Sequence, residues 1–194
     1  MKKQDIISFF NRCAPSWDEN MVRSDVIIGK IMDAAGIHEG MDVLDVACGT
    51  GVLFPDYCKR NVNSLTGIDI SPEMVKIARA NYPDVTVICG DVEETSFPHD
   101  FDAIMIYNAF PHFPEPERLI ASLVKKLKKG GTLTVAHGMS RAALHHHHSG
   151  VASSVSIDLL HEDELADIFT RCGLQVSAKI SDDEKYIVSG ILQG

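Results

Sequence analysis

The sequence lacks the features that mark several large classes of protein. No apolar run approaches the roughly 20 residues that a membrane span needs, and the basic N-terminus is not followed by the long apolar core of a signal peptide. The five cysteines are scattered, odd in number and contain no CxxC pair. We therefore expect reduced thiols in a cytoplasmic protein that has no membrane partner.

Positive charge is also scarce. Lys and Arg total 18 against 27 Asp and Glu, which gives a net charge of −9 with neutral histidines. Because Lys and Arg supply much of the affinity for nucleic-acid phosphates, we expect no nucleic-acid partner, although KKLKKG is a local basic patch. What the chain does have is enough hydrophobic sequence, 45% of 194 residues, to build the core of one domain.

Strand-like and helix-like segments alternate along the chain. Helices are expected at 71–82, where Ser71 caps and Pro72 begins the helix, and at 115–131, where leucines recur every four residues before Gly-Gly. This order predicts an α/β fold, a Rossmann-like seven-stranded sheet that is mostly parallel, with helices on both faces and an antiparallel C-terminal strand pair. The expected strands are 41–47, 64–70, 84–90, 101–109, 131–138, 174–180 and 185–192.

We expect a single domain over 1–194. It would comprise a helical leader or cap (1–40), a binding core (41–137), a His-rich insert (138–157), and a C-terminal helix and strands (158–194). Because the final strands can expose a sheet edge, the expected state is a monomer or weak homodimer.

The most informative segment is VLDVACGTGVL at 43–53. A strand runs into Asp45, and a turn that contains Gly49 and Gly51 leads into a helix. Such glycines let a ligand approach the main chain, and ligands of open α/β sheets bind at the carboxyl ends of the strands. A dinucleotide-binding turn would need a small residue where Phe54 stands. Asp45 also favours a cationic group, an ammonium or a sulfonium, over a pyrophosphate.

Five motifs follow one another along the chain: LDVACGTG, GIDIS, GDVEETSF, FDAIMIYNAFPHF and LKKGGTLTVAH. Together they resemble the successive motifs of class I S-adenosylmethionine (AdoMet)-dependent methyltransferases, over about 41–191. The resemblance implies an enzyme that uses AdoMet as its cofactor. Ala47 departs from the pattern, because many members have glycine there.

The resemblance implies a role for each matching position. Asp45 and the turn would face the methionine part of AdoMet, Asp69 would accept from both ribose hydroxyls, and Asp91 would accept from the adenine amino group. Taken alone, each acid could equally end a strand or cap a helix. The full expected cofactor-binding set is Asp45, Ala47, Gly49, Gly51, Asp69, Ile70, Asp91, Val92 and Asn108, the last lying near the transferred methyl group.

Histidines gather around the expected acceptor side. His112 follows the fourth expected strand, His137 ends the fifth, and HHHH stands at 145–148 in the insert. We expect His112, His137 and His148 to be catalytic. Three interpretations stay open: a site for Zn²⁺ or another divalent metal formed by these three residues, with His145 as a substitute; a general base with substrate contacts; or a solvated run.

The leading functional hypothesis is methyl transfer to a small molecule, because only the short leader and the insert remain to select the acceptor. Trp17 of the leader would cover the pocket edge or pack against the sheet. The alternatives are a non-catalytic AdoMet- or metal-binding protein of the same fold, and a methyltransferase acting on RNA or protein. NAFP at 108–111 stands in place of the NPPY-type signature for planar amino groups. A nicotinamide enzyme is disfavoured by Phe54.

Overall fold

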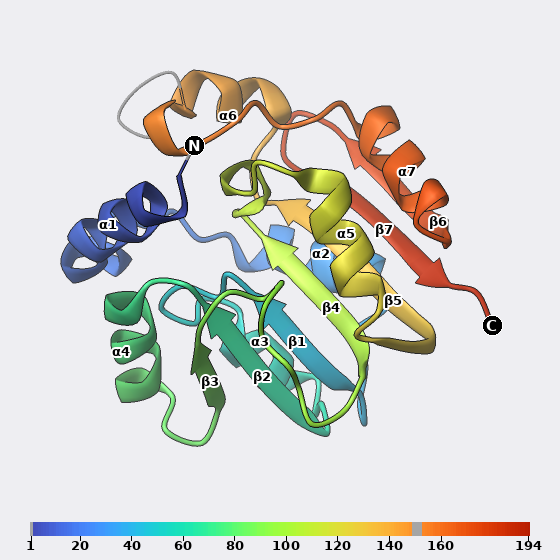
Figure 1. Ribbon diagram of the computed structural model, residues 1–194, viewed down its shortest axis with the longest axis horizontal. Coiled ribbons are helices and arrows are strands. Elements are labelled where there is room, and N and C mark those ends of the chain that lie inside the picture. Colours follow the sequence, from blue (N-terminus) through green and yellow to red (C-terminus); the bar gives the residue numbers. More distant parts are fainter. Residues whose placement is uncertain (1, 149–152) are drawn as a thin grey trace.

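A computed structural model gives the fold of the chain and describes residues 2–148 and 153–194 (Figure 1). The side chains of Asn20, 145–148 and Ser153 also lie outside the described residues. The strands are β1 (Asp42–Val46), β2 (Ser64–Asp69), β3 (Thr86–Cys89), β4 (Phe101–Tyr107), β5 (Leu127–His137), β6 (Leu174–Ser181) and β7 (Tyr186–Leu192). The α-helices are α1 (Lys3–Cys13), α2 (Asp25–Ala34), α3 (Phe54–Lys59), α4 (Pro72–Asn81), α5 (Pro116–Val124), α6 (Arg141–His148) and α7 (Glu162–Arg171).

The seven strands form one sheet in the order β3-β2-β1-β4-β5-β7-β6. β1 to β5 pair in parallel, and β7 lies antiparallel to both β5 and β6. The predicted fold class is therefore confirmed. The strand order reverses between β1 and β4, and ligands of such sheets bind outside the carboxyl ends of the strands at this switch point. Figure 1 shows α1 and α6 on the side to which the arrowheads of β2, β4 and β5 point.

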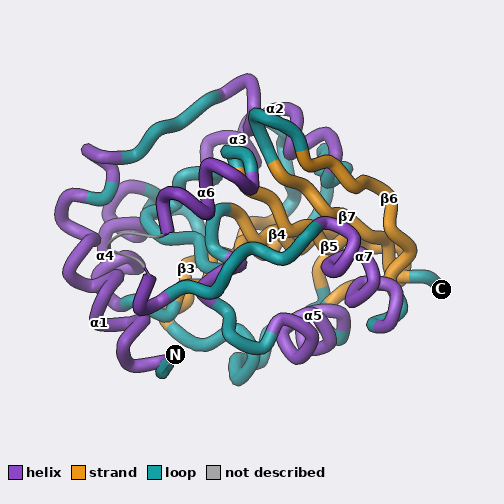
Figure 2. Tube along the Cα trace, turned by 90° about the horizontal axis from the view of Figure 1, so that it is seen from above, coloured by secondary structure: helices purple, strands orange, loops and turns teal. Residues whose placement is uncertain are grey.

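Alternate residues of the strands pack into two apolar layers, one on each face of the sheet. Leu44 and Val46 pack with residues of α5 and α7, whereas Val43 packs with residues of α2, α3 and α4. Figure 2 shows α2 and α3 on one side of the strands and α5 and α7 on the other. Because both faces are covered, the central strands are apolar on both faces, which explains their continuous apolar runs.

The leucine spacing predicted one helix over 115–131, and this prediction is wrong. α5 ends at Val124 and β5 begins at Leu127. Leu119 and Leu123 are buried on the helix, but Leu127 is buried in the sheet, where Phe101 is its strand partner. An i, i+4 spacing cannot show where the chain passes from a helix face to a sheet, because both environments bury leucine.

The predicted cap at Ser71 is confirmed, because its hydroxyl accepts from the Met74 N–H at 3.3 Å. The Ser140 hydroxyl likewise accepts from the Ala143 N–H at 3.1 Å at the start of α6. His161 caps α7 and accepts from the Asp163 N–H at 3.3 Å. Among the described residues, none of the helices combines the length and apolar character needed to cross a bilayer.

Gly51 is expected to tolerate no side chain. Its φ is +91°, and an added Cβ would lie 2.7 Å from the buried Phe54 ring and 2.9 Å from Tyr82. We expect Gly51→Ala to lower the free energy of unfolding by about 1–3 kcal/mol. Gly29 in α2 is the matched control, because its added Cβ would meet nothing within 4 Å. Gly29→Ala should stabilise by about 0.5–1 kcal/mol. Urea unfolding measures both, and equal stabilities would contradict this explanation.

Candidate functional site

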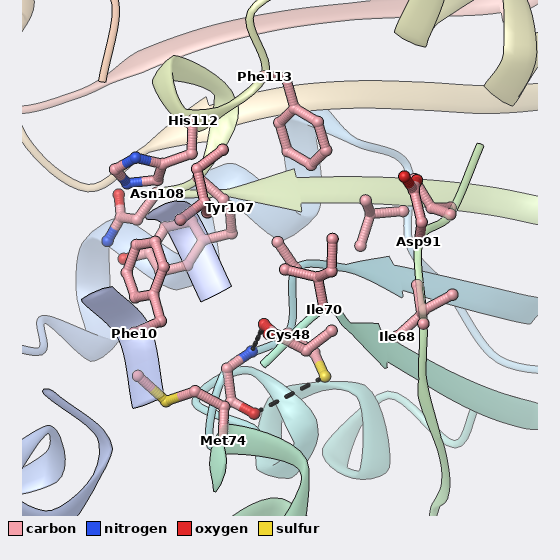
Figure 3. Close-up of a pocket in the computed structure, with 18 of the residues that line it drawn as sticks. Phe10, Cys48, Ile68, Ile70, Met74, Asp91, Tyr107, Asn108, His112 and Phe113 are labelled. Atoms are coloured by element: carbon pink, nitrogen blue, oxygen red, sulfur yellow. Dashed lines mark hydrogen bonds between the residues drawn. The ribbon is translucent and has the colours of Figure 1, made fainter. Parts of the chain in front are cut away.

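A cavity of about 330 Å³ opens at the carboxyl ends of β1, β2 and β4 (Figure 3). Its size lies within the range of small-molecule sites, about 300–1,000 Å³. The turn after β1, the ends of β2 and β3, the β4–α5 connection and the N-terminal segment form its walls. Two of the predicted cofactor-binding residues, Asp45 and Gly51, do not line it. The predicted residues that line it are Ala47, Gly49, Asp69, Ile70, Asp91, Val92 and Asn108.

The turn after β1 is built from left-handed residues. Ala47, Gly49 and Gly51 have φ angles of 55°, 56° and 91°. A left-handed conformation costs an L-residue such as Ala47 roughly 1–2 kcal/mol, which gives a physical reason for glycine at this position in related sequences. The turn bends around the end of β2, where the Cys48 N–H donates to the Ile68 carbonyl at 3.1 Å.

Asp69 holds this turn to the end of β2. Its Oδ2 accepts from the Gly49 N–H at 2.9 Å and its Oδ1 accepts from the Ser71 N–H at 2.8 Å. Burial raises the pKa of the Asp69 carboxyl, while these main-chain hydrogen bonds oppose the rise. A carboxylate offers about four lone-pair positions, and three main-chain N–H groups, those of Ser71, Gly49 and Ile70, interact with Asp69, so it retains acceptor capacity for a ligand.

Asp45 lies behind the cavity wall. It is buried in β1 with 2% of its surface exposed, and its neighbours Val46 and Ala47 line the cavity in its place. Burial raises the pKa of Asp45 well above its ordinary range, and the negative charge of Asp69 raises it further. The structure therefore places Asp45 behind the cavity wall rather than in the direct contact with the cavity that the sequence suggested.

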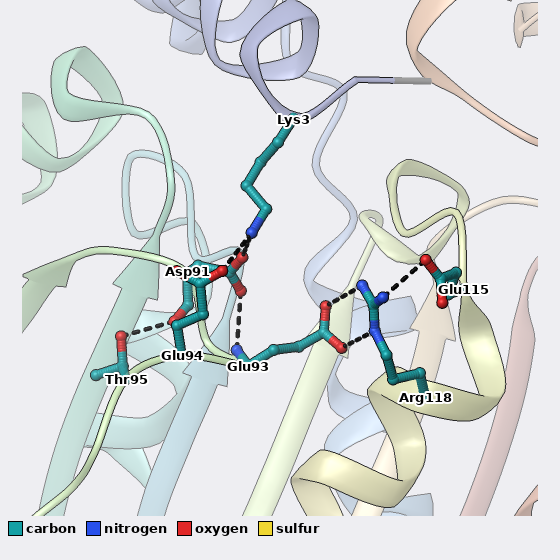
Figure 4. Close-up of polar contacts among 7 residues, drawn as sticks. All are labelled: Lys3, Asp91, Glu93, Glu94, Thr95, Glu115 and Arg118. Atoms are coloured by element: carbon teal, nitrogen blue, oxygen red, sulfur yellow. Dashed lines mark hydrogen bonds and ion pairs between the residues drawn. The ribbon is translucent and has the colours of Figure 1, made fainter.

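Charged side chains surround the Asp91 end of the cavity (Figure 4). Lys3 of α1 forms ion pairs with Asp91 and, at 2.8 Å, with Glu94. Hydrogen bonds to these two carboxylates raise the pKa of Lys3. Across the same mouth, Arg118 of α5 donates to Glu93 at 2.8 and 3.1 Å. These exposed pairs each contribute little stability, but they connect α1 and α5 to the segment after β3.

The opposite end of the cavity is mainly aromatic. Phe10 and Tyr107 lie there beside His112 (Figure 3), and Trp17 and Phe113 also line the cavity. The Phe10 ring packs edge-to-face on the His112 ring, with their centroids 4.8 Å apart. Figure 3 shows Phe10, Tyr107 and His112 around the cavity. Trp17 thus lies at the pocket, one of the two positions that the sequence allowed.

The structure brings only His112 of the predicted catalytic histidines to the cavity among the residues whose side chains it describes. His137 ends β5 fully buried, packs against Tyr186 with ring centroids 6.2 Å apart, and does not line the cavity. The side chains of His145 and His148 fall outside the described residues, although α6 forms over this stretch as expected. Within the described part of the chain, no group of three His, Cys, Asp or Glu residues could hold a metal ion.

The leader contributes several contacts that the sequence did not reveal. Asn11 accepts from the Ser71 hydroxyl at 2.7 Å, and Asp18 accepts from the Thr50 hydroxyl at 2.6 Å. With the Lys3–Asp91 pair, these contacts attach the leader to all three loops that carry the predicted cofactor-binding acids or glycines. No spacing in the sequence signals them, because they depend on how the leader folds back.

Comparison with known proteins decides the family. Residues 43–131 match a methyltransferase domain family. A demethylmenaquinone methyltransferase of Renibacterium salmoninarum is 31% identical over 144 residues, which cover 70% of this chain and 59% of that protein. The chain belongs to the class I AdoMet-dependent methyltransferase family. It spans 59% and 55% of the lengths of the first two curated relatives that it matches.

A further sequence relative and two solved structures are also similar to the chain. A ubiquinone biosynthesis O-methyltransferase of Neisseria meningitidis is 29% identical over 143 residues, covering 64% of this chain and 58% of that protein. The magnesium protoporphyrin IX methyltransferase of Synechocystis with bound SAH (S-adenosylhomocysteine) has a TM-score of 0.76 at 15% identity, covering 99% of this chain and all of that one. The [4+2]-cyclase SpnF has a TM-score of 0.79 at 18% identity, covering 99% and 96%. The fold alone therefore does not decide the reaction.

Proposed function

We propose that this chain transfers a methyl group from AdoMet to a small, apolar acceptor. The observation that carries the proposal is a single cavity with two unlike ends. Asp69 and Asp91, from the ends of neighbouring strands, line one part, and aromatic side chains line the other. A polar nucleoside and an apolar acceptor would each find complementary surroundings there.

The residues present fit the cofactor. Asp69 has acceptor capacity left for the ribose diol, and Asp91 is assigned to the adenine amino group, with Ile70 and Val92 beside the ring. The main chain of the turn after β1 is assigned to the methionine part. When bound, AdoMet supplies a methyl group made electrophilic by its sulfonium. The role assigned to Asp45 is to attract that positive charge from its buried position next to the cavity lining. The role assigned to Gly51 is to allow the backbone conformation of the turn.

The acceptor is assigned to the aromatic end. Phe10, Trp17, Tyr107 and Phe113 offer flat apolar surfaces, which suit a ring-shaped acceptor. Relatives named for demethylmenaquinone and ubiquinone biosynthesis support such an acceptor, because both names refer to quinones. His112 enters the proposal as a hydrogen-bonding imidazole at this end, and no metal is part of it.

The proposal is tested by product formation. We expect the purified protein to release SAH from AdoMet in the presence of at least one member of a panel of phenols, quinols, thiols and amines. Parallel reactions with a chelator test the metal alternative, and unchanged rates are expected. AdoMet binding without SAH release for any acceptor would favour the non-catalytic alternative. Tight NAD binding with no AdoMet binding would contradict the proposal outright.

A further inference from the structure

Gly138 directly follows β5 and lies against a side chain that lines the cavity. Its φ is outside the left-handed region, so the backbone at this position would accept any L-residue. An added Cβ would nevertheless overlap the hydroxyl oxygen of Tyr107, whereas the next nearest atom, Cζ of the same ring, would lie 3.4 Å away. Glycine is therefore required here by the position of the Tyr107 hydroxyl rather than by the conformation of the main chain.

The main chain of Gly138 is held in place by the end of β4. Its N–H donates to Oδ1 of Asn108 at 2.9 Å, and the Asn108 N–H donates to the Ala136 carbonyl at 2.9 Å. Tyr107 is itself the strand partner of Ala136. These contacts continue the pairing of β4 and β5 past the ends of the strands. An atom added at position 138 would therefore be accommodated by movement of the Tyr107 side chain.

The Tyr107 ring lies between the apolar core and the cavity. It packs against the layer that contains Met105 and Ala136, and it also lines the cavity, where Figure 3 shows it beside Asn108 and Phe10. Its hydroxyl forms a hydrogen bond with the Asn108 side chain. Because a packed core has little free volume, a displaced ring would move into the cavity. The position of this ring thus determines the width of the aromatic end.

We propose that Gly138 limits the size of the methyl acceptor, because its lack of a side chain leaves room for the Tyr107 hydroxyl outside the cavity. The proposal rests on the proposed methyl transfer to an apolar acceptor and adds a determinant of specificity to it. Gly138 does not line the cavity and acts through Tyr107, so it is a positioning residue. A single methyl group added at position 138 excludes large ring systems before small ones and leaves the cofactor end unchanged.

The only tryptophan of the chain provides a measurement of ring binding that does not depend on turnover. Trp17 lines the cavity, and nitroaromatic compounds quench tryptophan fluorescence. Nitrobenzene and 1-nitronaphthalene are neutral, share one functional group and differ by one fused ring. Saturable quenching by each compound, corrected for absorbance, gives two dissociation constants. The ratio of these constants reports the width of the aromatic end.

We expect Gly138→Ala to weaken the binding of 1-nitronaphthalene by about tenfold or more and that of nitrobenzene by about twofold or less, the usual selectivity of an apolar pocket that changes by one methyl group. SAH affinity, measured by calorimetry, should stay within about twofold of wild type. Gly29→Ala is the matched control, because an added Cβ there meets nothing within 4 Å. This control should leave both dissociation constants unchanged.

Removing the Tyr107 hydroxyl should rescue the effect of Gly138→Ala. Tyr107→Phe deletes the atom that the added methyl group overlaps and leaves Cζ at an ordinary contact distance of 3.4 Å. We therefore expect Gly138→Ala combined with Tyr107→Phe to bind 1-nitronaphthalene within about twofold of Tyr107→Phe alone. A general loss of stability would weaken both compounds alike, and urea unfolding of each variant measures that loss separately.

Tyr107→Leu tests the same wall without an added atom at position 138. Its shorter side chain widens the aromatic end, so the ratio of dissociation constants should shift towards 1-nitronaphthalene by about threefold or more. The proposal is overturned if Gly138→Ala weakens both compounds equally, if Tyr107→Phe gives no rescue, if Tyr107→Leu leaves the ratio unchanged, or if the wild type binds neither compound. The proposed methyl transfer is judged separately, by AdoMet binding and by SAH release with any acceptor.

Discussion

Replacing Asp45 by Asn is expected to stabilise the ligand-free protein at neutral pH and to weaken AdoMet binding. The folded-state pKa of Asp45 is raised by burial and by the nearby charge of Asp69. The ionised carboxylate is therefore disfavoured in the folded state, and the stability of the wild type falls as pH rises from the unfolded pKa, about 3.9, through the folded pKa. Asn does not titrate, so the variant should gain stability at pH above about 3.9 and none at lower pH.

Asp42 on the same strand provides the control, because its shift has the opposite sign. Hydrogen bonds from Lys128, Ser64 and Asn63 lower the pKa of Asp42. Its contribution to stability is present above the unfolded pKa and is lost as pH falls through the folded pKa. Urea unfolding across pH should therefore show Asp42→Asn losing stability at neutral pH while Asp45→Asn gains it. The same sign for both variants would contradict this electrostatic interpretation.

Asp45→Asn should lower the affinity of the protein for AdoMet. A carboxylate behind the wall attracts a positive sulfonium, so we expect the variant to lose more affinity for AdoMet than for SAH, whose sulfur is neutral. Calorimetry with both ligands gives the two ratios. Equal losses would show that Asp45 does not act through its charge on the sulfonium.

Removing the Asp69 carboxylate is expected to have the largest effect on cofactor affinity. Asp69→Ala removes the acceptor for the Gly49 N–H and for the Ser71 N–H, and also the proposed acceptor for the ribose hydroxyls. Hydrogen bonds to charged groups contribute about 1.5–3 kcal/mol each, so we expect SAH affinity to fall at least about a hundredfold.

Asp69→Asn separates the two roles of this side chain. It keeps one acceptor oxygen, so its SAH affinity should lie between those of wild type and Asp69→Ala. Thermal unfolding without ligand measures the loss of the turn contacts alone. If Asp69→Ala binds SAH as tightly as wild type, the assignment of the ribose to Asp69 is wrong.

Much of the fold was predictable because its signals are local. The strand and helix patterns, the Ser71 cap and the glycine turn each depend on a few neighbouring residues, and the alternation of strands and helices then predicted the sheet. The end of the 115–131 helix was missed because Leu127 continues the helical spacing while lying in β5. Boundaries of this kind depend on tertiary packing rather than on periodicity.

The sequence predicted which strand ends border the candidate site. It did not predict the direction in which each side chain points. Successive side chains of a strand point to opposite faces, so the end of β5 does not by itself bring His137 to the cavity. Instead His137 is buried against Tyr186. Phe10 and the Val155 carbonyl lie far from His112 in sequence, and only the folded chain places them against its ring.

A crystal structure of the protein with SAH is the most direct test of the central claim. We predict that the ribose hydroxyls lie on the Asp69 carboxylate, that adenine lies beside Asp91 and Val92, and that the sulfur faces the end of the cavity lined by Asn108 and His112. SAH bound outside this cavity, or bound in it with the sulfur at the Asp91 end, would contradict the account.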